Sequence, residues 1–434
     1  QNSGADAYNI AIGHTAGTAM SSGVRNVIMG GLAGDALTTG SYNVAIGYDA
    51  LSSEQTHGYN TAVGYNALRL QNAGADAYNV ALGYNAGENI STGAGNTLIG
   101  SQAGDALTTG GFNTVVGKSA LSTEDTNGYC TAVGYQALMT QDAGADALNT
   151  AVGFDAGGDI TTGTNNTLMG HEAGNALTTG SYNIAIGKGA LGAEDAHGRN
   201  VAIGHQALTN QDAGADAYNV AVGFYAGEAI STGVNNVLIG GEAGDAITTG
   251  GENIAMGRSA LSAKTTGGGD VAIGHQALQD ADGGDAFNVA VGYRAGRNIT
   301  SGIRNILIGA SAGDTLTAGL DNIAIGYQAL ATEDDHSYNT AVGHQALKAQ
   351  DAGADAYNVA MGYRAGYAVT SGVNNITIGA EAGIALTTGS YNVAVGHGAL
   401  ATEDTGGQNV AIGRNALNTL NYAGNGMNVA VGYN

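Results

Sequence analysis

Several residue types are scarce or missing in this chain of 434 residues. It has no proline, no tryptophan and one cysteine, and it has 13 Lys and Arg against 36 Asp and Glu, for a net charge of −23. Nucleic-acid binding needs a basic surface, which this composition excludes. The lone Cys130 excludes a disulfide framework, and no run of 18 apolar residues could span a membrane. We therefore expect no nucleic-acid partner and no membrane insertion in this segment.

Glycine is abundant, with 75 residues, but it follows no Gly-X-Y triplet, which excludes collagen. The chain instead repeats the stretch 42–51, Tyr-Asn-Val-Ala-Ile-Gly-Tyr-Asp-Ala-Leu, every 17 to 19 residues. Counted from the Asn, 25 copies begin at positions 9, 26, 43, 60, 79, 96, 113, 130, 149, 166, 183, 200, 219, 236, 253, 270, 288, 305, 322, 339, 358, 375, 392, 409 and 428.

The repeat is strict. Gly stands four residues after the Asn position in all 25 copies, and only Cys130 and Asp270 replace the Asn. The intervals run 17, 17, 17 and 19, except that the interval after Asp270 is 18. This gives a superrepeat of four coils that begins near 9, 79, 149, 219, 288, 358 and 428. A period below 20 is too short for a pair of helices, so we predict one continuous repeat region over 1–434.

The alternation of Val44 and Ile46 around a small residue is typical of a β-strand, and the following Gly47 permits a bend. Stacked coils would pair these strands in parallel, so we predict an all-β parallel solenoid of 25 coils. We expect a structural ladder of Asn43, Val44, Ile46, Gly47 and Ala50, with Val44, Ile46, Ala50 and Leu51 facing inward. Asn43 would either bond along the stack or occupy a left-handed turn.

Each coil also carries one large apolar residue on its return arm. It stands eleven residues after the Asn in the first two coils, as at Ile90 and Leu107, and eight after it in the third and fourth, as at Leu51 and Leu68. The middle strand position is Ala in 18 copies but large in most second coils. Since we place this position on the outer face, we predict interchain contacts at Ile28, Leu98, Leu168, Leu238 and Leu307.

The motif Asn43–Gly47, followed by the small Ala50, resembles the Asn-Ser-Val-Ala-Ile-Gly-x-x-Ser repeat of trimeric autotransporter adhesin heads. The variant at 338–347, Tyr-Asn-Thr-Ala-Val-Gly-His-Gln-Ala-Leu, resembles repeats of phage tail fibres. The resemblance covers essentially the whole chain and implies a left-handed parallel β-roll with three chains around one axis. Here Tyr-Asn replaces Asn-Ser, Ala replaces the last Ser, and the coils are longer.

Polar and aromatic residues recur at fixed places in the repeat. Ten of 21 Tyr precede the motif Asn and eight follow the motif Gly; they either stack on neighbouring coils or contact ligands. Six His also follow the Gly, and the closest two, His171 and His205, lie two coils apart, roughly 10 Å, too far to share a metal. The acidic turns, such as Glu124-Asp125, could hold Ca²⁺ but lack the nonapeptide of calcium-binding β-rolls, so we interpret them as a solvated face.

No catalytic constellation stands out, and we expect a non-enzyme without cofactor or metal. The sequence favours a structural fibre or adhesin, a homotrimer at a cell or virion surface that contacts a host surface protein or glycan. The alternative is a solenoid that binds a repetitive surface such as ice or glycan. Thr-Thr-Gly, as at Thr38–Gly40, occurs mainly in second coils, so we expect no continuous threonine row.

Overall fold

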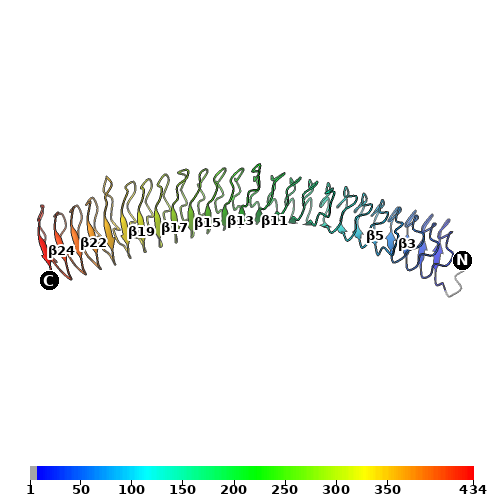
Figure 1. Cartoon of the computed structure of the whole chain (residues 1–434), viewed down its shortest axis with the longest axis horizontal. Coiled ribbons are helices and arrows are strands. Elements are labelled where there is room, and N and C mark those ends of the chain that lie inside the picture. The colour runs from blue at the N-terminus through cyan, green and yellow to red at the C-terminus, as the bar shows by residue number, and fades with distance from the viewer. Residues whose placement is uncertain (1–6) are drawn as a thin grey trace. The chain divides into compact units, whose positions relative to one another are not determined.

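A computed structural model describes residues 7–434 of the chain. It is a parallel β-solenoid of about 25 coils, and the described residues contain no helix. The predicted fold class is thus confirmed. The chain divides into two compact units, Gln1–Tyr218 and Asn219–Asn434. Each unit is a stack of coils that contribute one three-residue strand apiece (Figure 1). None of the described segments forms a helix able to cross a membrane.

The first unit contains twelve strands in its described part. Their bounds are β1 Ile10–Ile12, β2 Val27–Met29, β3 Val44–Ile46, β4 Thr61–Val63, β5 Val80–Leu82, β6 Thr97–Ile99, β7 Thr114–Val116, β8 Thr131–Val133, β9 Thr150–Val152, β10 Thr167–Met169, β11 Ile184–Ile186 and β12 Val201–Ile203.

The second unit contains thirteen strands. Their bounds are β13 Val220–Val222, β14 Val237–Ile239, β15 Ile254–Met256, β16 Val271–Ile273, β17 Val289–Val291, β18 Ile306–Ile308, β19 Ile323–Ile325, β20 Thr340–Val342, β21 Val359–Met361, β22 Ile376–Ile378, β23 Val393–Val395, β24 Val410–Ile412 and β25 Val429–Val431.

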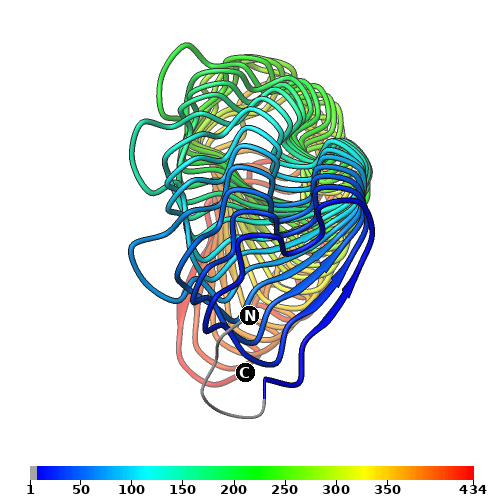
Figure 2. The same cartoon turned by 90° about the vertical axis from the view of Figure 1, so that its right-hand side faces the viewer.

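Within each unit, neighbouring strands pair in parallel and in register, so equivalent residues of the repeat lie above one another. Between β3 and β4, for example, Ala45 pairs with Ala62. The 19-residue coils accommodate their extra residues in longer loops, such as 141–147, and loops of this kind protrude from the stack in the end-on view (Figure 2). Insertions are absorbed there because loops lie outside the paired strands.

Left-handed residues turn the chain at the ends of each strand. In the coil of Asn43, the residues Tyr42, Asp49 and Leu51 have φ angles of 61°, 58° and 51°. Gly47 has φ of 137°, and a Cβ atom there would lie 2.2 Å from the carbonyl oxygen of Gly64 in the next coil. Only glycine fits this position, which explains why the motif Gly never varies.

The face of the strand that we predicted to point inward points outward, and the opposite face is buried. From β2 to β24 the middle residue of every strand is buried, whereas the first and third residues are half-buried or exposed. Ala50 and Leu51 are buried as predicted, but the prediction that Val44 and Ile46 point inward is wrong. The interior of the coil is thin, so a small residue such as Ala45 faces the large residue of the return arm across it.

Volume complementarity explains the large residues at the middle position. In the third and fourth coils, Leu stands eight residues after the Asn, and the middle residue of the strand is nearly always Ala. In the first and second coils, Gly stands eight residues after the Asn. A Cβ atom on Gly87 would lie 2.6 Å from Cδ1 of Leu98, and one on Gly104 would lie 3.0 Å from Cδ2 of Leu98. Leu98 therefore fills the space that two successive glycines leave in the core, as close packing requires.

The motif asparagines form a buried ladder. Asn43 donates its backbone N–H to Oδ1 of Asn26 at 2.8 Å, and its own Oδ1 accepts the backbone N–H of Asn60 at 3.0 Å. Its Nδ2 donates to the carbonyl oxygen of His57 at 3.2 Å. Of the two alternatives for Asn43, the structure has the hydrogen bonds along the stack, and the left-handed residue is the preceding Tyr42. Buried polar groups need such partners because an unpaired one costs about 1–3 kcal/mol.

The two residues that replace the motif Asn, Cys130 and Asp270, keep part of the hydrogen-bond ladder. The Cys130 backbone N–H donates to Oδ1 of Asn113 at 2.9 Å, and burial raises the pKa of its thiol to about 12. Asp270 accepts the backbone N–H of Asn288 at 2.8 Å and pairs with Nζ of Lys264 at 2.9 Å, with both side chains fully buried. Lys264 stands where the other complete superrepeats have a glutamate, so an Asn and a Glu are exchanged together for an Asp and a Lys.

Candidate functional site

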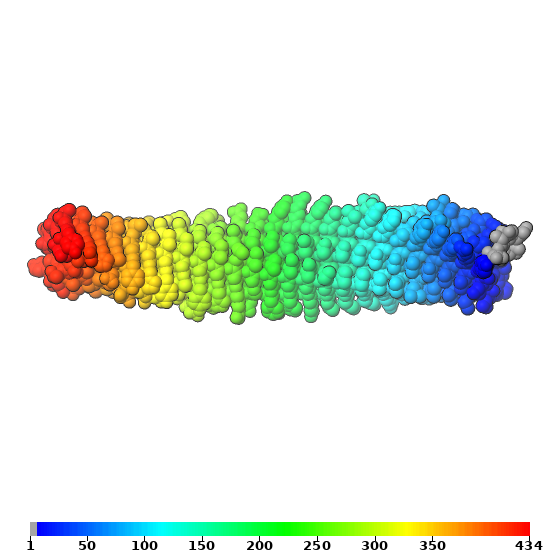
Figure 3. Space-filling model, turned by 90° about the horizontal axis from the view of Figure 1, so that it is seen from below, coloured from blue at the N-terminus to red at the C-terminus, as the bar shows by residue number. Residues whose placement is uncertain are grey.

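The outer face of the sheet presents two rows of apolar residues along each unit. The first strand position is Val, Ile or Thr in every strand, and the third is Val, Ile, Leu or Met. In β5, Val80 is 38% exposed and Leu82 is 47% exposed. No charged residue lies in either row, so the negative charge of the chain is confined to the turns and loops. In the space-filling view the coils appear as regular ribs across the surface (Figure 3).

The proposed interchain residues do not lie on this face. The prediction of interchain contact through them is wrong, because each has no exposed surface within a single chain: Ile28, Leu98, Leu168, Leu238 and Leu307. Their side chains instead fill the core beside the glycines of the return arms. A contact between chains must therefore use the two outer rows instead.

Aromatic ladders flank the outer rows on both sides. Before the motif Asn, the ring centroids of Tyr42 and Tyr59 are 5.0 Å apart, and Tyr59 and Tyr78 follow at the same spacing. After the motif Gly, Tyr48 and Tyr65 stack at 5.4 Å. The rings thus pack on neighbouring coils, as one of our two interpretations expected. They also stay 40–59% exposed, which leaves a face for a ligand.

The histidines that follow the motif Gly belong to the second ladder. His171 stacks on Phe154 at 5.0 Å, and His344 lies 5.2 Å from Tyr327 and 5.3 Å from Tyr363. These imidazoles replace aromatic rings in a stack. The structure does not bring two of the described histidines of this ladder together as a shared metal site.

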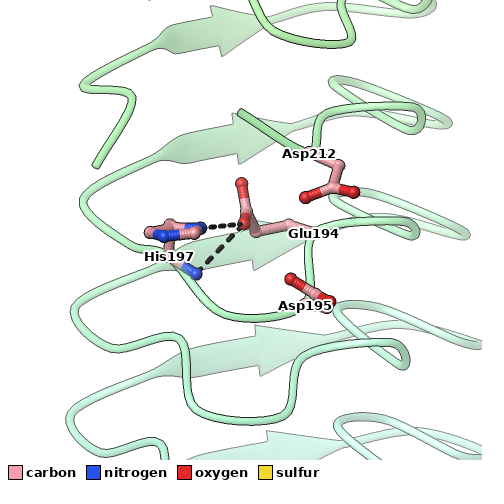
Figure 4. Close-up of side chains that lie close together, drawn as sticks. All are labelled: Glu194, Asp195, His197 and Asp212. Carbon is pink, nitrogen blue, oxygen red and sulfur yellow. Dashed lines mark hydrogen bonds and ion pairs between the residues drawn. The ribbon is translucent and has the colours of Figure 1, made fainter. Parts of the chain in front are cut away.

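The turns of the third coils instead gather a histidine with three carboxylates. Glu194, Asp195 and His197 follow β11, and Asp212 reaches the same place from the coil of β12 (Figure 4). Their candidate ligand atoms all lie within 4.8 Å of one another. Glu194 is fully buried, and its Oε1 accepts the backbone N–H of His197 at 3.1 Å.

The same arrangement recurs in the second unit. Glu333, Asp334, His336 and Asp351 form a cluster of the same composition and the same 4.8 Å extent. The Nδ1 of His336 lies 2.8 Å from Oε1 of Glu333 and 3.8 Å from Asp334. A third turn, with Glu124, has two aspartates but Asn127 in place of the histidine.

Burial affects the titration of these carboxyls. It raises the pKa of Glu194, against the hydrogen bond from the His197 backbone N–H, and it raises the pKa of Glu333, against the hydrogen bond from His336. Desolvation lowers the pKa of His336, but the hydrogen bond to Glu333 and the charges of Glu333, Asp334 and Asp351 together raise it by more, so its pKa is raised. These turns are thus electrostatically unlike the surrounding solvated loops.

The sequence analysis interpreted these acidic turns as a solvated face and considered only the six histidines after the motif Gly as metal ligands, so it missed the histidines within the turns. The signal was present: Glu-x-x-His occurs at the same repeat position in three third coils, as Glu54 to His57, Glu194 to His197, and Glu333 to His336. The contribution of Asp212 and Asp351 from the next coil depends on the stacking of the loops, which the sequence does not display.

No family model and no curated protein matches this chain, so the function rests on the repeat, the outer sheet face and the turn clusters.

Proposed function

We propose that this protein is a non-catalytic structural fibre segment, a shaft or head of an adhesin or virion fibre at a cell or virion surface. In this proposal three copies pack around one axis through the outer rows of the sheet. A single observation carries the argument: every described strand turns two partly exposed, uncharged residues outward, nearly all of them apolar.

The extent of this face favours a covered surface. A strip about 10 Å wide with strands about 4.8 Å apart amounts to roughly 50 Å² per coil, or roughly 600 Å² in a unit of a dozen strands. The largest apolar patch of a soluble monomer is about 300–600 Å². The outer face of one unit thus lies at the upper limit of this range, which favours a covered surface.

The distribution of charged residues also favours the outer rows as the contact surface. Copies with a net charge of −23 repel one another, and this repulsion is weakest where the contact excludes the acidic turns. The outer rows satisfy this condition because they carry no charged residue. Burial of their Val and Ile side chains supplies the attraction, at about 25 cal/mol per Å² of apolar surface. The exposed edges of the aromatic ladders remain beside the contact, where they suit a glycan or a host protein.

Sedimentation of the purified chain tests this proposal. We expect a particle with three times the 42.8 kDa mass of one chain. Replacing Val237 and Ile239 together by Asp should yield monomers with an intact solenoid, because both side chains are only half-buried in the single chain. The control variant replaces Thr232 and Asn235, two exposed turn residues, by Asp. It adds the same charge and should leave the trimer intact. A monomeric unmodified chain would refute the assembly.

A second candidate, binding to a repetitive surface such as ice, has one observation in its favour. The expectation that no threonine row is continuous is wrong, because the first strand position is Thr in five successive strands, at Thr97, Thr114, Thr131, Thr150 and Thr167. These side chains are half-buried or exposed and repeat at about 4.8 Å. Thermal hysteresis that disappears when Thr131 is changed to Lys would favour this candidate over the fibre.

A further inference from the structure

The turn clusters around Glu194 and Glu333 contain buried polar atoms that have no hydrogen-bond partner. Oε2 of Glu194 and Oε2 of Glu333 accept no hydrogen bond, and Nδ1 of His197 makes none either, although it lies 3.7 Å from Oε1 of Glu194. Both glutamates are fully buried. Native structures rarely leave such atoms unpaired, since each costs about 1–3 kcal/mol, so an unpaired group indicates that a ligand such as an ion binds there.

Equivalent turns without the full set satisfy the same oxygen. Oε2 of Glu54 accepts the backbone N–H of Ala73 at 3.4 Å, and Oε2 of Glu124 accepts that of Ala143 at 3.4 Å. Oε2 of Glu403 accepts the backbone N–H of Tyr422 at 3.3 Å. Among the described third-coil turns that contain this glutamate, its Oε2 is free only in the two that combine a histidine with two aspartates.

The charge of these clusters is not balanced by the protein. Each holds three carboxylates around one imidazole, and no described Lys or Arg forms an ion pair with any of the eight residues. Nearby acidic residues behave otherwise: Asp216 pairs with Arg199, and Asp321 pairs with Arg304 at 2.7 Å.

We propose that each cluster binds one divalent metal ion of the Zn²⁺ type through Glu194, His197, Asp212 and Asp195 in the first unit. Glu333, His336, Asp351 and Asp334 form the second site. Metal–ligand bonds of about 2.1 Å place tetrahedral ligand atoms about 3.4 Å apart, so small side-chain rotations suffice to close groups within 4.8 Å. We expect the free Oε2 to bind the metal, because Oε1 of Glu194 already accepts the His197 N–H.

The donor set determines which ion fits. Ca²⁺ and Mg²⁺ prefer oxygen ligands only, whereas Zn²⁺ takes imidazole nitrogen together with carboxylate oxygen. The histidine is thus the element that selects a transition metal. Because Glu194 and His197 belong to one coil and Asp212 to the next, a bound ion would link successive coils across the longer loop. This inference goes beyond the fibre function and does not depend on the number of chains in the assembly.

Metal counting on the full-length chain tests the proposal. After equilibrium dialysis against Zn²⁺, mass spectrometry should find two ions per chain, and none after the combined changes His197→Gln and His336→Gln. His57→Gln is the matched control: its turn has the Glu and the His but Gln55 and Asn72 in place of the aspartates. This variant should still bind two ions.

A gain of binding provides a test that misfolding cannot mimic. Asn127→His completes the turn that already contains Glu124, Asp125 and Asp142, so the count should rise from two ions to three. The proposal is overturned if Zn²⁺ shows no saturable binding, if the count is unchanged in His197→Gln with His336→Gln, or if Ca²⁺ binds equally well without these histidines. The last outcome would show that the turns bind cations through carboxylate oxygens alone, without the histidines.

Discussion

A double-mutant cycle between Leu238 and Gly244 tests how the core is filled. Leu238 lies in the middle of β14 with no exposed surface, and Gly244 has φ of 57° in the return arm of the same coil. A Cβ atom on Gly244 would lie 2.8 Å from Cδ2 of Leu238 and 2.8 Å from Cδ1 of Ile247. The two residues therefore occupy one shared volume, and changes at either one should depend on the other.

The magnitudes follow from the packing. Leu238→Ala removes a fully buried side chain and should lower the free energy of unfolding by about 3–5 kcal/mol. Gly244→Ala adds left-handed strain of about 1–2 kcal/mol and overpacking of about 1–3 kcal/mol. In the double variant the overpacking against Leu238 disappears and the cavity is partly filled. The combined loss should thus be smaller than the sum of the single losses by about 1–2 kcal/mol.

Urea denaturation followed by tyrosine fluorescence, together with hydrogen exchange of the amides around β14, provides the measurement. Val237→Ala is the control on the adjacent outer position, where the side chain is only half-buried, and it should cost about 1 kcal/mol or less in the isolated chain. Strict additivity of the two changes, or a loss for Leu238→Ala no larger than that of Val237→Ala, would refute our assignment of the inner face.

Three further predictions concern single sites. Asp270→Asn alone should lower the free energy of unfolding by about 3–5 kcal/mol because it leaves Lys264 buried without a counter-charge, and adding Lys264→Glu should restore most of this loss in a urea melt. Gly257→Val should lower the melting temperature and local amide protection, since its Cβ would lie 2.5 Å from the carbonyl oxygen of Gly274; an unchanged melt would contradict this. Cys130 should resist alkylation at mildly alkaline pH until the chain is unfolded, because its thiol pKa is raised to about 12 and the thiolate is scarce; rapid native-state labelling would disprove its burial.

The sequence predicted the solenoid because its signal is repeated 25 times, and every copy reports the same strand and the same bend. It did not determine which face of the strand points inward. Val44 and Ile46 alternate with Ala45, and hydrophobic alternation alone favours placing the larger pair inside. The correct assignment required noticing that Leu98 accompanies Gly87 and Gly104, a relation of volumes rather than of hydrophobicity.

The turn clusters were predictable only in part. Glu194 and His197 belong to one turn, so their three-residue spacing is visible in the sequence. Asp212 stands 15 residues beyond His197, and its approach depends on how a longer loop folds over the coil below. The free oxygen of Glu194 is a property of hydrogen-bond geometry, which no sequence pattern reports.

The filling of the core by residues from successive coils also limits how such a chain can change in length during evolution. Loss of the single coil 79–95 would place Leu68 next to Leu98 in the core. In the intact chain Gly87 separates them, and a Cβ atom there would lie 2.6 Å from Cδ1 of Leu98 and 3.1 Å from Cδ2 of Leu68. Loss or duplication of about 70 residues, a whole superrepeat, would leave every large residue opposite its glycine. Natural length variants should therefore differ by multiples of four coils, so that the gene grows or shrinks in fixed steps.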